Sequence, residues 1–311
     1  MEQTKTPNHQ PVLLQEVIEA MKLADEQTIV DGTLGLGGYS EKALQSAKKL
    51  KIVAFELDQA NLDLAKKRLA EFSSQMIYVN DNFANIKREL ANVEVEKVDG
   101  LMLDLGLSSP QIDLAERGFS FGKEGALDMR YGKEQPLTAA DVVNTYDIEK
   151  LTKIFREYGE ERSAYKIATA IVARRAEKKF TTTTELADFI AASVGGKKER
   201  IHPATRVFQA LRIEVNRELS SLEQVLNDSV DLLNPKARVA VVSYHSLEDR
   251  IVKNFFRDAS REYVNLPNEL TTTYLHPKLR LINKKPITPS AEEIQANPRS
   301  RSAKLRIAEK I

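Results

Sequence analysis

The chain has 311 residues, of which 42% are hydrophobic and 29% charged, proportions typical of an ordinary globular protein with a sizeable core. It contains no cysteine, which excludes disulfides, thiolate metal sites and cysteine nucleophiles. No apolar run is long enough to span a membrane, and residues 1–10 lack the apolar core of a signal peptide, so we expect a cytoplasmic protein.

The net charge of +1 is unevenly distributed. Residues 160–217 hold 12 basic and 7 acidic side chains, residues 276–311 hold 9 and 3, and the rest of the chain has a net charge of −10. Two basic stretches on an acidic body indicate local contact with a polyanion, although solvated helix faces often give similar counts.

After a helix expected over residues 11–21, a short buried strand leads into a glycine-rich turn. The turn, DGTLGLGGYS (31–40), has glycines at 35, 37 and 38 and runs into a helix near Ser40. Glycines let the backbone approach a ligand closely, so the turn is typical of a nucleotide-cofactor loop. The dinucleotide fingerprint is not met, because Ser40 stands where its third glycine belongs. A turn that only lets strand and helix pack is the alternative interpretation.

Two further predicted strands, 51–55 and 76–79, also end at polar residues. Glu56 follows the first, about where a nucleotide-binding βαβ unit places the carboxylate that binds ribose hydroxyls. Asp58 competes for this role, but an acid at a helix start is commonly a cap. Polar residues and then Phe83 follow the second strand, and this pattern suits an adenine that is hydrogen-bonded along one edge and covered on one face.

A fourth buried strand, beginning at Val98, ends at Asp104. In open α/β sheets, ligands bind outside the carboxyl ends of the strands. Asp31, Glu56, Phe83 and Asp104 all fall at such ends, which is hard to attribute to chance. The sequence therefore predicts an α/β fold with a ligand site at one edge of its sheet.

The pattern between residues 113 and 215 is different. Amphipathic helices are expected over 138–144, 148–158, 161–176 and 184–193, and Thr138 with Asp141 and Thr182 with Glu185 are candidate capping boxes. Helices without strands indicate an inserted all-helical domain, which leaves 1–112 and 216–311 for the sheet domain. Eight basic side chains supply charge for phosphates, although each alone is more often solvated surface: Lys166, Arg174, Arg175, Lys178, Lys179, Lys197, Lys198 and Arg200.

A long helix over 216–233 returns the chain to the sheet domain, and a buried strand over 238–243 follows. His245, just beyond this strand, is a candidate acid, base or RNA contact, and a structural histidine is an equally good interpretation. Residues 267–299 are proline-rich and expected to be irregular, and the alternation over 302–308 predicts a final strand.

With these residues in place, the chain resembles a class I S-adenosylmethionine-dependent methyltransferase and, more narrowly, the bacterial MraW/RsmH family. The resemblance spans residues 9 to 309 and rests on an ordered series of motifs: HQPVLL (9–14), DGTLGLGGYS (31–40), the segment 99–111, ERGFSF (116–121), LDMR (127–130), YGEER (158–162), HPATRVFQALRIEVN (202–216), SYHSLEDRIVK (243–253) and NPRSRSAKLRIAE (297–309). It implies a Rossmann-like class I methyltransferase sheet with helices on both faces, and an inserted helical domain that helps to hold RNA.

The resemblance also implies a reaction: methyl transfer from S-adenosylmethionine to N4 of a cytidine in the decoding region of small-subunit rRNA, either as free rRNA or within the small ribosomal subunit. The residues expected to bind the cofactor are Gly37, Gly38, Tyr39, Glu56, Phe83, Asp104 and Gln111. We expect Asp104 and Ser108 to accept hydrogen bonds from the target amine, whose lone pair is delocalised into the ring. A role of Asp104 in cofactor binding alone is also open. No ligand cluster has metal spacing, and no metal is expected.

Three residues depart from the family pattern, since Tyr39 replaces a usual histidine, Glu56 an aspartate and Tyr244 a phenylalanine. Glu56 keeps the carboxylate but adds a methylene, so hydrogen bonds to the ribose are re-aimed. The alternative functions are a methyltransferase acting on protein or a small molecule, and a non-catalytic RNA-binding assembly factor. A dehydrogenase is disfavoured by Ser40 and by the basic helical insert.

Overall fold

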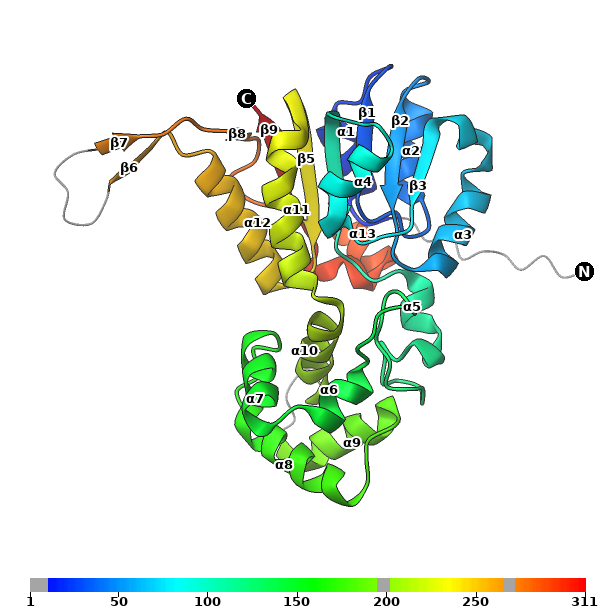
Figure 1. The fold of residues 1–311 in the computed structure, drawn as a ribbon, viewed down its shortest axis with the longest axis vertical. Coiled ribbons are helices and arrows are strands. Elements are labelled where there is room, and N and C mark those ends of the chain that lie inside the picture. The colour runs from blue at the N-terminus through cyan, green and yellow to red at the C-terminus, as the bar shows by residue number, and fades with distance from the viewer. Residues whose placement is uncertain (1–10, 195–201, 266–271) are drawn as a thin grey trace, which may run out of the picture. The chain divides into compact units, whose positions relative to one another are not determined.

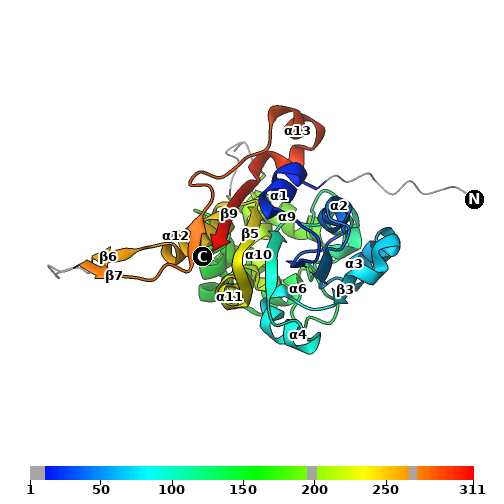
Figure 2. The same cartoon turned by 90° about the horizontal axis from the view of Figure 1, so that it is seen from above.

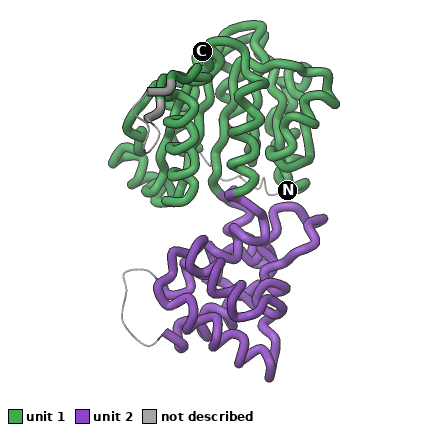
Figure 3. Tube along the Cα trace, turned by 60° about the vertical axis from the view of Figure 1, so that its left-hand side comes forward, with its two compact units in different colours: residues 1–106, 220–311 green, residues 107–219 purple. Residues whose placement is uncertain are grey.

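The computed structural model describes residues 11–194, 202–265 and 272–311. The sequence predictions for His9, Gln10, Lys197, Lys198 and Arg200 lie outside these ranges. The chain forms two compact units, one of residues 1–106 and 220–311 and one of residues 107–219 (Figure 3). The sequence placed the divisions after residues 112 and 215. In the described ranges, no helix is long and apolar enough to cross a membrane.

The first unit is built on a seven-stranded sheet of order β3-β2-β1-β4-β5-β9-β8 (Figure 1). The strands are β1 (Thr28–Asp31), β2 (Lys51–Phe55), β3 (Met76–Val79), β4 (Val98–Asp104), β5 (Leu233–Ser243), β8 (Leu279–Leu281) and β9 (Lys304–Lys310). Strands β1 to β5 run parallel, β9 pairs antiparallel with β5, and β8 pairs antiparallel with β9. Since β2 lies on one side of β1 and β4 on the other, the strand order reverses between β1 and β4, where open α/β sheets bind ligands.

Helices cover both faces of the sheet, as predicted (Figure 2). One face packs under α1 (Leu14–Met21), α2 (Gly38–Ser46) and α3 (Gln59–Arg68). The other face packs under α4 (Ile86–Asn92), α11 (Glu218–Leu232) and α12 (Ser246–Ala259). Ile29 contributes to the first buried cluster and its neighbour Val30 to the second, because successive strand side chains point to opposite faces.

The segment 267–299, expected to be irregular, contains regular elements in its described part, so that prediction was wrong. It holds β7 (Thr272–Tyr274), which pairs with β6 (Tyr263–Asn265), together with β8 and α13 (Ala291–Ala296). Leu279 pairs with Lys310 across β8 and β9. A three-residue strand is too short to show an alternating pattern, and this one forms because β9 offers it a partner edge.

The second unit is helical, with its own buried core around Phe155, Phe180 and Leu211. Its α-helices are α5 (Ser109–Asp113), α6 (Ala139–Thr145), α7 (Ile148–Glu157), α8 (Ala164–Glu177), α9 (Thr183–Val194) and α10 (Ala204–Asn216). The capping box of Thr138 and Asp141 is present at the start of α6. The long helix predicted from residue 216 is in fact α11, because Arg217 takes a left-handed conformation (φ 52°) that ends α10.

A buried ion pair joins α12 to β9 in the first unit. The Asp249 carboxylate accepts hydrogen bonds from Arg306 Nε at 2.6 Å and from Lys304 Nζ at 3.2 Å. Burial raises the pKa of Asp249, but the hydrogen bonds from these two cations outweigh burial, and the pKa lies below its ordinary value. The pair therefore fixes the first turn of α12, which begins at the carboxyl end of β5, against the sheet.

We expect Arg306→Met to lower the free energy of unfolding by about 3 kcal/mol, because it leaves the buried charge of Asp249 incompletely paired. Urea unfolding at pH 7 measures the loss, which should shrink in acid as Asp249 becomes protonated. Arg257→Met is the matched control, since it removes one of two exposed partners of Asp258 and should hardly change the unfolding midpoint. Equal losses in both variants would contradict burial as the cause.

Candidate active site

Polar side chains gather where the parallel strands end. Asp31 and Asp104 are the last residues of β1 and β4, Glu56 directly follows β2, and Tyr244 directly follows β5. Since these strands are parallel neighbours, their carboxyl ends meet at the same edge of the sheet. The structure thus brings the predicted acidic residues to one edge.

Three of the four glycines in glycine loop 31–40, Gly32, Gly37 and Gly38, are packed tightly, and Gly35 is open. A Cβ at Gly37 would lie 2.9 Å from Leu69 Cδ1, and one at Gly38 would lie 2.4 Å from Pro11 Cγ. Gly35 has φ +54°, and an added Cβ there would meet only the Thr33 carbonyl oxygen at 3.9 Å. Gly37 and Gly38 therefore allow the close packing of α2, whereas Gly35 is where the loop backbone stays accessible.

Glu56 is bound to this loop through its carboxylate. One oxygen accepts the backbone N–H of Gly35 at 2.8 Å, and the other accepts the N–H of Asp58 at 2.8 Å. Burial raises the pKa of Glu56 to about 8, and the neighbouring Asp58 adds to the rise. Asp58 itself accepts from Ala60 N at 3.1 Å and caps α3, so the capping interpretation of this residue is confirmed. Binding of a cofactor's ribose hydroxyls by Glu56 stays a prediction.

The segment after β3 lies beside Glu56. Asn80 Nδ2 donates to the Glu56 carbonyl oxygen at 2.7 Å, and Asn82 caps the short helix that starts at Phe83 by accepting from Ala84 N. Phe83 is half-buried against the second hydrophobic cluster, and its Cβ lies 3.4 Å from a Cβ built at Gly32. Its ring thus begins next to the glycine loop, where an adenine-covering role was predicted.

Asp104 carries a buried oxygen that lacks a partner. Its carboxylate accepts hydrogen bonds from the Tyr244 hydroxyl and the Gly106 N–H, yet Oδ1 has no hydrogen-bond partner among the residues that the structure describes. Burial raises the pKa of Asp104 to about 7, although these two hydrogen bonds oppose the rise. A buried acceptor without a donor is costly, so this oxygen is the atom best placed to receive a ligand's N–H.

Asp31, Asp104 and Tyr39 line the same narrow gap, which is too small to hold a water molecule. Asp31 is 1% exposed, and burial raises its pKa to about 6. Its oxygens accept from Ser40 Oγ at 2.7 Å and from Thr33 N at 3.2 Å, and these bonds join the end of β1 to the first turn of α2. Asp31 is therefore fully engaged in holding the loop.

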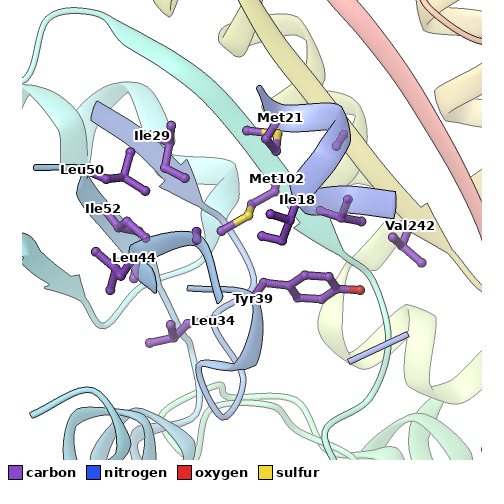
Figure 4. Close-up of a cluster of buried hydrophobic side chains, with 14 of the residues drawn as sticks. Ile18, Met21, Ile29, Leu34, Tyr39, Leu44, Leu50, Ile52, Met102 and Val242 are labelled. Carbon is purple, nitrogen blue, oxygen red and sulfur yellow. The ribbon is translucent and has the colours of Figure 1, made fainter. Parts of the chain in front are cut away.

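Tyr39, predicted as a cofactor contact, directs its side chain into the core. Its ring lies among Ile18, Leu34 and Val242 in the first hydrophobic cluster (Figure 4), and its hydroxyl donates to the Val12 carbonyl oxygen. Its backbone N–H lies in the first turn of α2, where helix N–H groups have no intrahelical acceptor. Any contact of Tyr39 with a cofactor is thus expected through the backbone.

Ser108 and Gln111 belong to the second unit, where they form a capping box. Ser108 Oγ accepts the Gln111 N–H at 3.4 Å, and Gln111 Oε1 accepts the Ser108 N–H at 3.0 Å. These hydrogen bonds cap the N-terminus of α5, so both side chains have a structural role. Catalysis by Ser108 and cofactor binding by Gln111 stay predictions.

Sequence reasoning missed two contacts of Asp104. Thr33 Oγ1 accepts the Asp104 N–H at 2.6 Å, and the Tyr244 hydroxyl reaches the carboxylate. No local pattern signals either contact, because the partners are separated by long stretches of chain and meet only in the folded sheet. His245 Nε2 lies 3.0 Å from Glu248 Oε1, beside the same edge.

The family model and the curated relatives that match this sequence point to the same family. A model of the MraW methylase family matches residues 6–311. Ribosomal RNA small subunit methyltransferase H of Carboxydothermus hydrogenoformans is 49% identical over 98% of each chain, and that of Dehalococcoides mccartyi (strain BAV1) is 48% identical over 97% of this chain and 86% of its own. A solved rRNA methylase from Streptococcus thermophilus aligns over 98% of this chain and 99% of that chain, with 12% identity and a TM-score of 0.43.

We expect Glu56→Gln to weaken binding of S-adenosylmethionine about 10- to 100-fold, because the amide replaces one of the two carboxyl oxygens with an NH2 group that cannot accept a hydrogen bond from the ribose. Isothermal titration calorimetry measures the affinity, and Glu71→Gln, a change at an exposed glutamate, is the matched control.

A cofactor analogue that lacks one ribose hydroxyl separates ribose binding from damage to the loop. It should lose affinity for the wild type but little for Glu56→Gln, because the variant has already lost the interaction. Equal losses in the two proteins would show that Glu56 does not bind the ribose.

Proposed function

The chain belongs to the MraW methylase family, and from this premise we propose that it transfers a methyl group from S-adenosylmethionine to N4 of a cytidine in the decoding region of small-subunit rRNA. The single observation that carries the chemical part of the proposal is the buried Oδ1 of Asp104 at the end of β4, which has no hydrogen-bond partner within the described part of the chain. The rRNA part is supported by relatives at 43–49% identity that are named ribosomal RNA small subunit methyltransferases.

The residues at the sheet edge fit S-adenosylmethionine. Glu56 offers a carboxylate to the ribose hydroxyls, the backbone at Gly35 is open to close approach, and Phe83 lies where a base would be covered. We propose that the first turn of α2, with Gly37, Gly38 and the Tyr39 backbone, completes this site. When bound, S-adenosylmethionine supplies a methyl group on a positively charged sulfur, which needs no metal for its transfer.

Asp104 meets the needs of the methyl acceptor. The exocyclic amine of cytosine is a weak nucleophile, and a hydrogen bond from its N–H to a carboxylate localises the lone pair and stabilises the developing positive charge. A pKa of about 7 leaves a substantial part of Asp104 ionised at neutral pH, and the same carboxylate can take the proton that the amine loses. Burial of Asp104 Oδ1 would keep water from this oxygen, and a hydrogen bond to it would position the amine for methyl transfer.

The second unit offers a surface suited to RNA. Tyr165 on α8 is 64% exposed, and the side chains of Arg162, three residues before it, and Lys166, directly after it, are exposed too. An exposed aromatic ring that is close in sequence to exposed cations is suited to stacking on an unpaired base while the cations contact phosphates. In contrast, Arg174 is paired with Glu185 at 3.1 Å and Arg175 donates to the Val143 carbonyl oxygen, so these two hold the unit together. We propose that Arg162, Tyr165 and Lys166 contact the rRNA.

The alternatives fit less well. A methyltransferase for protein or small molecules needs neither the basic helical unit nor relatives named for rRNA, and an assembly factor without catalysis needs no unpartnered Asp104 oxygen. We propose that the substrate is presented within the small ribosomal subunit, in the cytoplasm. Its target base must leave the stack to reach a buried acceptor.

We expect Asp104→Asn to slow methyl transfer by about a hundredfold or more, because the neutral amide stabilises the developing charge poorly. The assay uses labelled methyl transfer to small subunits from cells that lack this enzyme, with the nucleoside identified by mass spectrometry. Asp63→Asn, a change at an exposed residue, is the control. If Asp104→Asn lost only cofactor affinity and reacted normally at saturating cofactor, Asp104 would bind the cofactor alone.

We expect the double variant Arg162→Gln/Lys166→Gln to weaken binding to small-subunit RNA and to reduce the slope of log affinity against log salt by about 1 to 2. The measured quantity is RNA affinity by filter binding between low and moderate salt. Lys153→Gln/Arg156→Gln removes the same charge from exposed positions on α7 and is the matched control. An equal change of slope in both double variants would reduce the proposed contact to general surface charge.

A further inference from the structure

Tyr244 lies between the end of β5 and the start of α12, and both its backbone and its ring are held in place. Its N–H donates to Glu248 Oε2 at 2.8 Å. Its ring packs over Gly106, where an added Cβ would lie 2.9 Å from ring atom Cε2 and 3.0 Å from Cζ. Any side chain larger than hydrogen at position 106 would displace the ring, so the chain after β4 leaves the space that this ring fills.

The hydroxyl of Tyr244 reaches the Asp104 carboxylate and donates a hydrogen bond to it. Burial raises the pKa of Tyr244 well above its ordinary value, so the hydroxyl remains a neutral donor across the range in which the enzyme works. Together with the Gly106 N–H, this donor occupies part of the carboxylate and leaves Oδ1 without a partner among the described residues. The carboxylate thus accepts hydrogen bonds from these two donors, while its Oδ1 accepts none from the described residues.

The charged groups around Asp104 come from several elements, and most are acidic. Asp31 on β1 and Glu248 on α12 both raise the pKa of Asp104. The charge of Asp104 raises the pKa of Tyr39 on α2, and the charge of Glu293 on α13 raises the pKa values of both Tyr39 and Tyr244. His245 Nε2 lies beside Glu248. In this acidic setting, the Tyr244 hydroxyl and the Gly106 N–H are the groups that favour the ionised carboxylate.

We infer that Tyr244 is a positioning residue for methyl transfer, whose hydroxyl holds the Asp104 carboxylate in the orientation that leaves Oδ1 free for the target amine. The inference rests on the proposed function, in which Asp104 receives that amine. The same hydrogen bond also keeps more of the carboxylate ionised near neutral pH. Tyr244 acts through Asp104 and need not touch the substrate.

Tyr244→Phe tests the inference, because it removes only the hydroxyl and keeps the ring over Gly106. Without the donor, the pKa of Asp104 rises, and the acidic limb of the rate of methyl transfer should move by about one unit to higher pH. Because the reactive form of Asp104 is ionised, the variant should be several-fold slower than the wild type at pH 6.5 and nearly equal to it at pH 9. Single-turnover rates at saturating cofactor measure the profile.

Tyr78→Phe is the matched control, since Tyr78 lies on β3, separated from β4 by two strands. It should leave the pH profile unchanged, and thermal unfolding should show that both variants are folded. A profile of Tyr244→Phe that coincides with that of the wild type, in a folded protein, would overturn the inference. An equal shift in Tyr78→Phe would overturn it too, because the effect would not depend on contact with Asp104.

A second readout does not depend on activity. The protein labelled with carbon-13 at aspartate carboxyls reports the titration of Asp104 by NMR, with the signal assigned through its loss in Asp104→Asn. We expect a titration midpoint about one unit higher in Tyr244→Phe, and an unchanged midpoint would overturn the inference. If the wild type transferred no methyl group at any pH while the midpoint still moved, the proposed function would fail and the contact between Tyr244 and Asp104 would stand.

Discussion

The site depends on burying carboxylates at the ends of parallel strands and holding them mainly with backbone N–H groups and hydroxyls. Glu56 is held by the N–H groups of Gly35 and Asp58, and Asp31 by Ser40 and Thr33. Such donors satisfy the oxygens without a full countercharge, so burial raises the pKa values toward neutrality. The sheet edge is therefore a place where carboxyl groups can gain or lose protons near pH 7, which acid-base chemistry requires.

The sheet and the helical unit could largely be predicted because their signals are local. The residues directly before Asp31, Glu56 and Asp104 are apolar strand residues, and Thr138 with Asp141 marks a helix start by side-chain chemistry that acts over three residues. The failures lie where a residue's role depends on distant chain. β8 forms only because β9 offers an edge, and Gly37 packs against Leu69, the residue that follows α3. Local sequence patterns do not show which distant residues come into contact in the folded chain.

In the candidate site too, local features could be predicted and contacts between distant residues could not. The positions of Glu56 and Asp104 follow from where strands end, so the sequence located them. Which oxygen is satisfied, and by which donor, depends on contacts such as that of Tyr244 with Asp104, 140 positions apart in the numbering. Side-chain exposure is equally hard to predict, since no local sequence pattern shows that Tyr165 is exposed to solvent and Tyr39 is buried. The sequence therefore predicts the chemistry better than the geometry that tunes it.

The insertion of residues 107–219 between β4 and β5 constrains how the protein folds during synthesis. β4 and β5 are neighbours in the sheet, yet β5 cannot pair until the whole helical unit has been made. A long flexible loop would make this pairing slow, because closing it costs chain entropy before any contact is gained. Helices α6 to α10 pack on one another around their own core, so the unit can fold first and shorten the effective loop between the two strands. The first half of the sheet must wait, with the β4 edge unpaired, until then.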